Sequence, residues 1–581
     1  MCRAGSHRGL PCPAAAVLLV AVLQGCAGPH GSAGQTSQST RHETPVRQEP
    51  PPIPPGLPAA PGEYDLAAEV LHYDLELALG SSDIVARARV TVAGGGSREI
   101  PFDFTGLLVR SVALEGRPVD FVHDGGKLLV PLGATQDTVT VEIRYAGTPD
   151  DGLIIRTNSR GRPSAFVDNW PNRTRFWLPS IDHPADKATA AFTVHAPAEW
   201  EVVANGRMVA DPEPTREGSS GGRPGMRTWR WETRVPQPSY TLVVGATDFH
   251  IESVGRAACG LSPATPDPDG CIDVTIWAYD EDVPFARRVF GRADQMVDYF
   301  AGRFGPYPFE KLAHVQSATR FGGMENSSAI FYSEEAITTE ALSEGTVSHE
   351  VAHQWFGDSA TQSDWSHLWL SEGFATYFGN QFFEVADGEA DFLRRMEEAR
   401  QSYLASEVTN EPIVSRRPPS NLFQLLNANN YEKGGWVLHM LRGLLGDDTF
   451  FAGVKSYYGR YALSNADTDD FRHVLEETSG RPLQWFFDQW LLAPGYPVLD
   501  LEWQWDEAAA SVRVDVRQIQ RAGWPTFRIP TSIRIVTGDT ATDTEVEITE
   551  REFSVRLPAP SRPDRVIVDP EGWILKGNAS R

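Results

Sequence analysis

Alternating hydrophobic and polar residues dominate the first half of the chain, from about residue 64 to residue 246. The segments 72–77 and 139–143 alternate residue by residue, and Gly and Pro separate such runs. A repeat of two places successive side chains on opposite faces of a strand, and few positions here recur at helical spacing. The pattern predicts an all-β domain over residues 63–246.

The periodicity changes near residue 280. Apolar residues recur at helical spacing over 283–304, Gly305-Pro306 stops this pattern, and further helical segments continue to about residue 492. Spacings of three and four place apolar side chains on one face of a helix. We therefore predict a mainly helical domain over residues 247–494.

Strand-like alternation returns after this helical region. Residues 511–516 and 528–535 both alternate, and the whole segment 495–577 reads as a small antiparallel β-sandwich. The predicted fold class is therefore multidomain α+β, and we expect no helical domain after the sandwich. A length of 581 residues agrees with several domains, because one hydrophobic core rarely serves a chain of that size.

A short apolar run, residues 14–23, follows a basic stretch at the N-terminus. The run is too short to span a bilayer comfortably and is typical of a signal peptide, which we place at residues 1–25. It ends in Leu-Gln-Gly-Cys26, which resembles a bacterial lipobox and implies lipidation of Cys26. The expected location is the bacterial cell envelope, with the lipid as the only membrane contact. A soluble secreted protein and an uncleaved anchor are the alternatives.

Residues 26–62 are rich in Ser, Thr, Gln, Gly and Pro and include a nearly continuous proline run at 50–55. Such a composition cannot bury a hydrophobic core, because it has almost no aromatic residues. We expect a disordered tether that is extended near its end and holds a folded domain away from a membrane.

Beyond the expected signal peptide and the expected lipidated Cys26, two of the five cysteines remain, Cys259 and Cys271, which flank a loop rich in Pro and Asp. Cys2 and Cys12 would leave with the signal peptide. In an exported protein a remaining pair this close predicts a disulfide that closes a surface loop. Two buried free thiols are the alternative.

The chain has 52 Lys and Arg against 77 Asp and Glu, for a formal net charge of −25. This balance argues against nucleic acid and against an anionic membrane surface as partners. The acidity keeps the protein soluble or, as the alternative, marks an acidic cleft that attracts cationic substrate ends. The sequence does not define the oligomeric state, for which we expect a monomer.

His349, Glu350 and His353 form an H-E-x-x-H motif. On a helix, positions i and i+4 share one face, so both imidazoles can bind one ion while Glu350 reaches a water molecule on it. Glu372 follows after eighteen residues, within the helical pattern 365–383, and a second helix packed on the first would supply it as the third ligand. Two His and one Glu leave a fourth position open, as in catalytic zinc sites. We predict one Zn²⁺ and a peptidase with Glu350 as general base.

With these residues in place, the chain from about residue 64 onward resembles peptidase family M1, the zinc metallo-aminopeptidases of the gluzincin type. The resemblance implies a thermolysin-like catalytic domain and peptide substrates with a free N-terminus. The motifs that carry it are, in chain order, Gly322-Gly323-Met324-Glu325-Asn326, His349 to His353 with Glu372, and Tyr431-Glu432-Lys433-Gly434.

The resemblance also implies roles for single residues. The hydroxyl of Tyr431 would stabilise the oxyanion that forms on the scissile carbonyl. Glu325 would hold the α-ammonium of the substrate by a charge-assisted hydrogen bond, which makes the enzyme an exopeptidase. The other residues of the same motif would contact the substrate: Gly322, Gly323, Met324 and Asn326.

The chain departs from the family in two places. Many relatives carry a Gln in the N-terminal domain that helps to hold the amine, and residues 168–175 contain none. Either Asp168 or Asn169 replaces it, or Glu325 holds the amine with other help. Larger relatives also add a C-terminal helical domain that closes the cavity. The rival functions are a thermolysin-type endopeptidase, a non-catalytic surface binding protein, and a zinc epoxide hydrolase.

Overall fold

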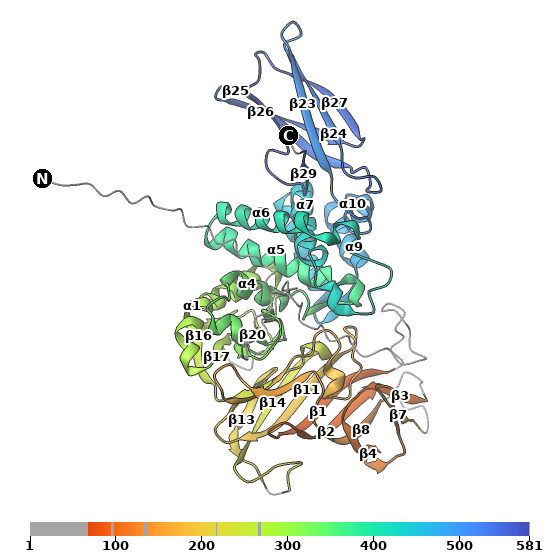
Figure 1. Cartoon of the computed structure of the whole chain (residues 1–581), viewed down its shortest axis with the longest axis vertical. Coiled ribbons are helices and arrows are strands. Elements are labelled where there is room, and N and C mark those ends of the chain that lie inside the picture. The colour runs from red at the N-terminus through yellow and green to blue at the C-terminus, as the bar shows by residue number, and fades with distance from the viewer. Residues whose placement is uncertain (1–67, 94–97, 133–137, 217, 265–268, 580–581) are drawn as a thin grey trace, which may run out of the picture. The chain divides into compact units, whose positions relative to one another are not determined.

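The computed structural model describes residues 68–93, 98–132, 138–216, 218–264 and 269–579, all within one compact unit of the chain (Figure 1). The expected signal peptide (1–25) and the expected lipidated Cys26 with its tether (26–62) lie outside the described residues. Within the described ranges, no helix has both the length and the apolar composition needed to cross a membrane. The elements form three successive regions: strands, then mostly helices, then strands again.

Three β-sheets make up the first region, whose described helical structure is limited to short 3-10 turns. The eight-stranded sheet has the order β13 (Arg207–Pro214), β14 (Met226–Pro238), β11 (Lys187–Pro197), β1 (Glu69–Leu79), β2 (Ile84–Ala93), β8 (Thr138–Gly147), β4 (Leu108–Leu114) and β5 (Arg117–Pro118). The four-stranded sheet has the order β12 (Glu201–Ala204), β15 (Val244–Thr247), β10 (Pro163–Val167) and β9 (Leu153–Thr157). The three-stranded sheet has the order β3 (Glu99–Asp103), β7 (Lys127–Pro131) and β6 (Val122–Asp124).

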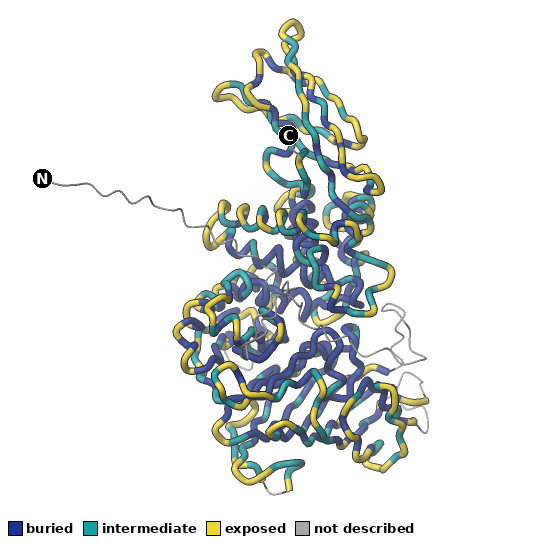
Figure 2. The backbone as a smooth tube through the Cα atoms, viewed as in Figure 1, coloured by how far each residue is buried: buried dark blue, intermediate teal, exposed yellow. Residues whose placement is uncertain are grey.

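Strand β1 shows how the alternating pattern becomes a sheet. Tyr73, Leu75 and Leu77 are buried, and the residues between them are partly exposed. The register places Leu75 opposite the buried Ala88 of β2 and the buried Phe192 of β11. Burial of one face therefore fixes the register, and Figure 2 shows how much of this region is buried.

The second region combines a five-stranded sheet with helices. The sheet has the order β16 (His250–Ala257), β17 (Ile272–Ala278), β18 (Leu312–Ser317), β20 (Ala329–Ser333) and β19 (Gly323–Met324), and a small parallel pair consists of β21 (Ala360–Gln362) and β22 (Ser464–Ala466). The helices are α1 (Val283–Val289), α2 (Ala293–Phe304), α3 (Glu334–Thr338), α4 (Glu344–His353), α5 (Trp369–Ala386), α6 (Glu389–Ala405), α7 (Gly434–Leu445), α8 (Asp447–Tyr461), α9 (Thr468–Ser479) and α10 (Gln484–Trp490).

The helical pattern over 283–304 forms two helices, α1 and α2, rather than one. The interruption contains Gly291, and glycine in a helix interior costs about 1 kcal/mol relative to alanine. Likewise the helical pattern over 365–383 begins as a 3-10 turn, Trp365–His367, before α5 starts at Trp369. The disulfide Cys259–Cys271 joins the chain just after β16 to the residue before β17.

Two sheets form the third region. Their orders are β27 (Glu552–Pro558), β24 (Ser511–Gln518), β23 (Val498–Asp506), β29 (Gly577–Asn578), and β26 (Thr540–Ile548), β25 (Ile529–Thr537), β28 (Arg565–Val568). Val512 and Val514 of one sheet and Ile533 and Ile535 of the other are buried in the same hydrophobic cluster.

Two lysines connect the N-terminal β domain with the catalytic region in opposite directions. Lys187 of β11 donates through Nζ to the carbonyls of Asp358 (3.2 Å) and Ser359 (2.6 Å). Lys311 donates through Nζ to the carbonyls of Ala204 and Ser328, both at 3.0 Å. Burial lowers the pKa of both lysines to about 7. These contacts attach the β domain to the segments that surround the candidate site.

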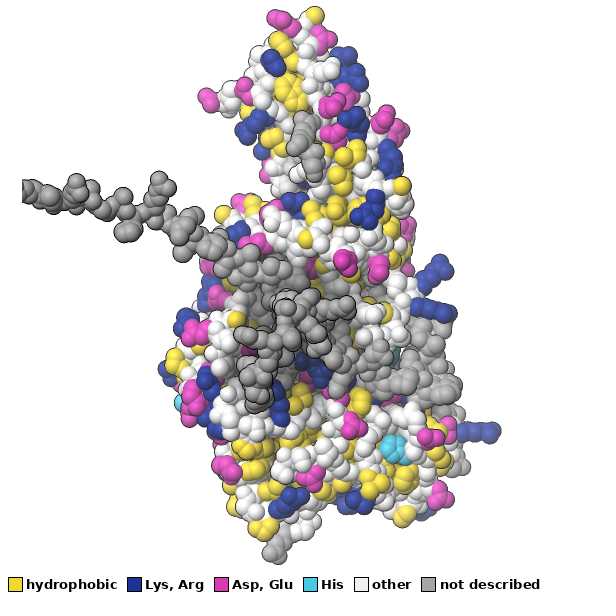
Figure 3. Space-filling view, in the orientation of Figure 1, with side chains coloured by type: hydrophobic (Ala, Val, Ile, Leu, Met, Phe, Trp, Pro, Cys, Tyr) yellow, Lys and Arg dark blue, Asp and Glu magenta, His cyan; other side chains and the backbone are white. Residues whose placement is uncertain are grey.

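On the face shown in Figure 3, acidic and basic side chains are interspersed. Such side chains also pair directly, for example Arg394 with Glu398 at 2.7 Å on α6. Each exposed pair contributes little to stability, because water screens it. Such mixing favours solubility of a chain with a net charge of −25.

Candidate functional site

Helix α4 carries the three residues of the H-E-x-x-H motif. Ser343 caps it, because its hydroxyl accepts a hydrogen bond from the amide of Thr346 at 3.0 Å. His349 and His353 lie one turn apart on the same face, and their Nε2 atoms are 3.0 Å apart. Both imidazoles are buried. The helix therefore presents two ring nitrogens to a single point.

Helix α5 brings Glu372 to the same point. Its Oε2 atom lies 3.3 Å from Nε2 of His349 and 3.3 Å from Nε2 of His353. The close packing depends on Gly379, since a Cβ there would lie 2.9 Å from the backbone nitrogen of His349. Burial opposes ionisation of Glu372, but His353 and His349 beside it hold its pKa down, at about 2. The third candidate ligand is thus a buried carboxylate.

These three residues fit a zinc ion. One ligand atom from each lies within 4.8 Å of the other two. His353 Nδ1 is 3.1 Å from the carbonyl of Phe356 and 3.1 Å from the hydroxyl of Ser371, which favours a proton on Nδ1 and a free lone pair on Nε2. Two imidazoles and one carboxylate form the ligand set of catalytic zinc sites.

Glu350 lies between the metal ligands and the segment that contains Gly323. A Cβ on Gly323 would overlap the carboxylate of Glu350, so only glycine allows the chain to pass this close. Glu350 is 5% exposed, and burial raises the pKa of its carboxyl above the usual value, although His353 opposes the shift. A carboxylate with a raised pKa is suited to take up and release a proton near neutral pH.

Glu325 is the second buried carboxylate beside the ligands. A carboxylate oxygen of Glu325, one of Glu350 and a ring nitrogen of His353 lie within 4.8 Å of one another. Gln354 fixes the loop, because its Nε2 donates to the carbonyl of Glu325 at 2.9 Å and its Oε1 accepts from the amide of Ser328 at 2.8 Å. Burial raises the pKa of Glu325 to about 7. The geometry therefore places a second buried carboxyl group next to Glu350.

Tyr431 approaches the ligands from a π-helical turn, Asn429–Lys433. Its ring stacks on His349 with centroids 5.9 Å apart and an interplanar angle of 8°. Asn429 secures the turn, since its Nδ2 donates to the carbonyls of Val408 and Glu411, both at 3.1 Å. Burial and the charge of Glu372 raise the pKa of Tyr431, so its hydroxyl remains a donor. A π-turn is frequent at functional sites.

The structure brings six of the predicted residues together: His349, Glu350, His353, Glu372, Glu325 and Tyr431. In the rest of the Gly322–Asn326 loop, Gly322 and Met324 form backbone contacts that hold the loop in place. The carbonyl of Gly322 accepts a hydrogen bond from the amide of Ser333 at 3.2 Å, and Met324 of β19 pairs with Phe331 of β20. Asn326 is buried, and neither atom of its side-chain amide has a partner among the described residues.

Neither Asp168 nor Asn169 is free to hold a substrate amine. Asn169 donates to the carbonyls of Ser239 (3.2 Å) and Leu242 (2.7 Å) and accepts from Trp177 Nε1 (2.8 Å). Asp168 is bound by Arg320, Arg173 and Thr319. The expected replacement of the family glutamine by one of these residues is therefore wrong: their polar atoms already have protein partners.

Sequence patterns missed several supporting residues. Gln354 directly follows the zinc motif, and that adjacency is the only local signal for its role. Ser371, Gly373 and Gly379 act through packing between α4, α5 and the Tyr431 turn, which no spacing rule identifies.

Comparison with known proteins agrees with this geometry. The family model "Peptidase M1 N-terminal domain" matches residues 69–241, and the model "Peptidase family M1 domain" matches residues 289–490. A probable aminopeptidase 2 of Sulfurisphaera tokodaii is 26% identical over 453 residues, which are 74% of this chain and 54% of the relative. Aminopeptidase M1-B of Oryza sativa subsp. japonica is 31% identical over 467 residues, which are 74% of this chain and 50% of the relative.

A solved structure has the same fold. Legionella pneumophila aminopeptidase A, in complex with aspartic acid, superposes with a TM-score of 0.74 at 17% identity, over 90% of this chain and 61% of that chain. The chain spans about half the length of the curated relatives it matches. The two family models cover, in chain order, most of the β domain and most of the domain with the candidate zinc ligands, and the chain therefore belongs to peptidase family M1.

Proposed function

We propose that this protein is a zinc-dependent aminopeptidase that removes N-terminal residues from peptides. The observation that carries the proposal is the position of Glu325, a buried carboxylate within 4.8 Å of Glu350 and His353. A fixed anion at this distance from the general base selects a substrate whose own cation lies one residue from the scissile bond. That cation is the free α-ammonium of a peptide.

His349, His353 and Glu372 would hold the zinc ion. When bound, the ion supplies Lewis-acid chemistry: it polarises the scissile carbonyl and lowers the pKa of water. Glu350 takes the proton of the attacking water at its carboxylate and passes it to the leaving amine. The Tyr431 hydroxyl donates a hydrogen bond to the oxygen of the carbonyl as negative charge develops there.

Glu325 performs the selection. Burial raises its pKa to about 7, and an α-ammonium in contact with it would favour the ionised carboxylate. Binding is then strong only for a substrate that carries a positive charge at its N-terminus. An acetylated peptide lacks this charge and leaves Glu325 buried without a partner, which costs binding energy.

Aminoacyl arylamides test the proposal directly. The wild-type protein should hydrolyse an aminoacyl arylamide, should leave its N-acetylated counterpart intact, and should lose activity in a chelator until Zn²⁺ is restored. Efficient cleavage of the acetylated substrate, or cleavage inside a blocked peptide, would instead identify a zinc endopeptidase. Absence of turnover with zinc bound would point to the non-catalytic binding protein.

We also propose that the enzyme is exported and held in the cell envelope by a lipid on Cys26. The lipobox-like Leu-Gln-Gly-Cys26 supports this location, and so does the disulfide Cys259–Cys271, because disulfides persist in oxidising compartments. Metabolic labelling with a radioactive fatty acid should mark the wild-type protein and leave a Cys26→Ser variant unlabelled. Equal labelling of both would refute the anchor.

A further inference from the structure

Arg320 connects the substrate-binding loop with the N-terminal β domain. It stands two residues before Gly322. Its Nε donates to Asp168 Oδ2 at 3.0 Å, and its Nη2 donates to Asp151 Oδ1 at 2.9 Å. Both carboxylates belong to the β domain, and both are nearly inaccessible to water. The side chain therefore ties the start of the loop to a second domain.

Asp168 collects several donors at this point. Its Oδ1 accepts the hydroxyl of Thr319 at 3.2 Å, and its Oδ2 also forms an ion pair with the buried Arg173 at 3.0 Å. Burial opposes the charge of Asp168, but Arg173 and Arg320 keep its pKa below the usual range. Arg173 in turn binds Asp151 at 2.8 Å. Two aspartates and two arginines thus form a closed cluster that holds Thr319 and Arg320 in place.

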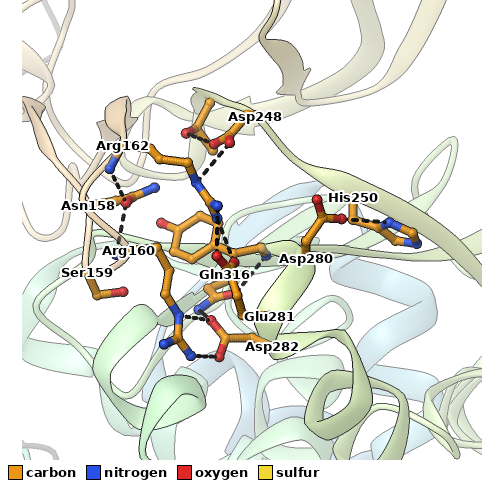
Figure 4. Close-up of polar contacts among 12 residues, drawn as sticks. Asn158, Ser159, Arg160, Arg162, Asp248, His250, Asp280, Glu281, Asp282 and Gln316 are labelled. Carbon is orange, nitrogen blue, oxygen red and sulfur yellow. Dashed lines mark hydrogen bonds and ion pairs between the residues drawn. The ribbon is translucent and has the colours of Figure 1, made fainter.

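A second clamp lies at the opposite end of the same strand. Asp168 directly follows β10, and Arg162 directly precedes it. Arg162 pairs with Glu281 at 2.9 Å and with Asp248 at 2.8 Å, as Figure 4 shows. Arg160 forms an ion pair with Asp282 in the same group. Strand β10 is therefore fixed to the catalytic region at both ends.

The second clamp reaches strand β18, which leads into the substrate-binding loop. Gln316 of β18 donates through Nε2 to Asp282 at 2.8 Å. The chain then leaves β18 and passes through Thr319 and Arg320 into the loop that contains Glu325. The Arg160–Asp282 pair therefore contacts the start of this connection through Gln316, and the Arg320 cluster fixes its end, next to the loop. Arg162 itself binds Glu281 and Asp248, which lie outside this connection.

We propose that Arg320 and Asp168 are positioning residues that hold the Gly322–Glu325 segment, so that Glu325 stays in register with the α-ammonium of the substrate. The inference rests on the proposed aminopeptidase function. In this arrangement the β domain contributes to amine recognition through the loop, since the side chain of Asn169 is occupied by Ser239, Leu242 and Trp177. A misplaced carboxylate near the chemistry loses much of its effect, because such contacts depend steeply on geometry.

The test uses two zinc-binding inhibitors that differ only in the ammonium: an amino-acid hydroxamate and its des-amino analogue. In Arg320→Gln, the inhibition constant of the amino-acid hydroxamate should rise about tenfold and that of the des-amino analogue should stay the same. Arg320→Lys should recover part of the loss, because it keeps the positive charge. A general loosening of the fold would instead weaken both inhibitors equally.

Arg162→Gln is the matched control, because Arg162 (28% exposed) and Arg320 (33% exposed) both pair across the same two domains. Its ratio of the two inhibition constants should equal the wild-type ratio. Asp168→Asn should change the ratio in the same direction as Arg320→Gln, and the double variant should add little, since both changes break one contact. If Asp168→Asn does not fold, the Arg320 variants decide.

Two outcomes overturn the inference: an unchanged ratio in Arg320→Gln, or the same change in Arg162→Gln. A failure of the proposed function looks different. In that case the wild-type protein itself would bind the two hydroxamates equally and would not hydrolyse aminoacyl arylamides.

Discussion

Gly373 and Gly434 meet backbone to backbone: a Cβ on Gly373 would lie 2.8 Å from the Cα of Gly434. Gly373 directly follows Glu372, a proposed zinc ligand, and Gly434 comes three residues after Tyr431. The contact therefore sets the distance between a metal ligand and the proposed oxyanion donor. No side chain separates the two helical segments at this point.

A methyl group at this crossing should impair catalysis. Gly434→Ala would push the Tyr431 turn away from α5 and cost about 1–3 kcal/mol of stability through overpacking. We expect kcat to fall by about tenfold or more, because the hydroxyl loses its alignment. Gly302→Ala in α2 is the control: no atom lies within 4 Å of its Cβ, and stability should rise by about 0.5–1 kcal/mol with unchanged activity. Full activity in Gly434→Ala would contradict the role of the contact.

Replacement of Glu350, the proposed general base, should separate chemistry from metal binding. Glu350→Gln keeps the shape of the side chain but cannot accept a proton, so kcat should fall by about 10²–10⁴-fold. Elemental analysis should still find one zinc ion per chain, because Glu350 is not among the three proposed ligands. Glu344, on the same helix, pairs with Arg292 away from the site. The control variant Glu344→Gln should therefore retain activity. Loss of zinc in Glu350→Gln would indicate that Glu350 helps to bind the metal ion.

Loss of the tyrosine hydroxyl should affect the transition state alone. Tyr431→Phe retains the ring that stacks on His349 and removes only the donor. We expect kcat to fall by about 10²–10³-fold while KM changes little, since the substrate carbonyl carries little charge before reaction. Steady-state kinetics with one aminoacyl arylamide measure both constants. A change confined to KM would indicate a role in binding instead.

Removal of zinc should lower stability as well as activity. The ion binds only the folded arrangement of His349, His353 and Glu372, so saturation at about a thousand times the dissociation constant adds about 4 kcal/mol to the free energy of unfolding. Chelated protein should therefore melt at a lower temperature and recover on addition of Zn²⁺. Glu372→Gln should show the lower melting temperature with or without zinc. Identical melting curves for chelated and zinc-loaded wild type would count against a built metal site.

Acid should destabilise the protein through His314, which is far in sequence from the zinc ligands. This side chain is fully buried beside the rings of Phe290 and Tyr332, and burial lowers its pKa to about 3. In the unfolded chain the pKa is about 6.5. Between these values only the unfolded state binds the proton, so stability is complete above about pH 6.5 and falls as pH drops toward 3. At pH 5 the loss is about 2 kcal/mol.

Urea unfolding at pH 7.5 and pH 5 measures this effect. The wild-type protein should lose stability between the two values, and His314→Gln should lose about 2 kcal/mol less, because it no longer has the titrating group. His473→Gln, at an exposed position on α9, should behave like the wild type. Equal pH dependence in wild type and His314→Gln would show that His314 does not cause it.

The convergence of His349 and His353 could be predicted from the sequence because the i and i+4 spacing determines which side chains share a helix face. Glu372 was predictable only together with a second helix, whose approach depends on Gly379. The strands of the β domain followed from alternation, as in β1. These signals are local in the sequence, so they can be recognised without knowledge of the packed structure.

Other features could not be predicted because they depend on partners far along the chain. Asn169 looked available, yet its amide is bound by carbonyls some seventy residues away. The helical pattern over 283–304 did not reveal the break at Gly291 that separates α1 from α2. Hydrogen-bond partners and helix approach are properties of the packed structure, and side-chain spacing does not encode them.

The opposed contacts of Lys187 and Lys311 limit how this protein can be rearranged. Each lysine satisfies carbonyls in the neighbouring domain, so a catalytic fragment cut free near residue 247 would lose the donor to Asp358 and Ser359 and would leave Lys311 without Ala204. A chimera that takes its β domain from a relative must reproduce both crossings. We therefore expect that the catalytic region cannot be transferred without the β domain, and that substitutions in one domain constrain those in the other.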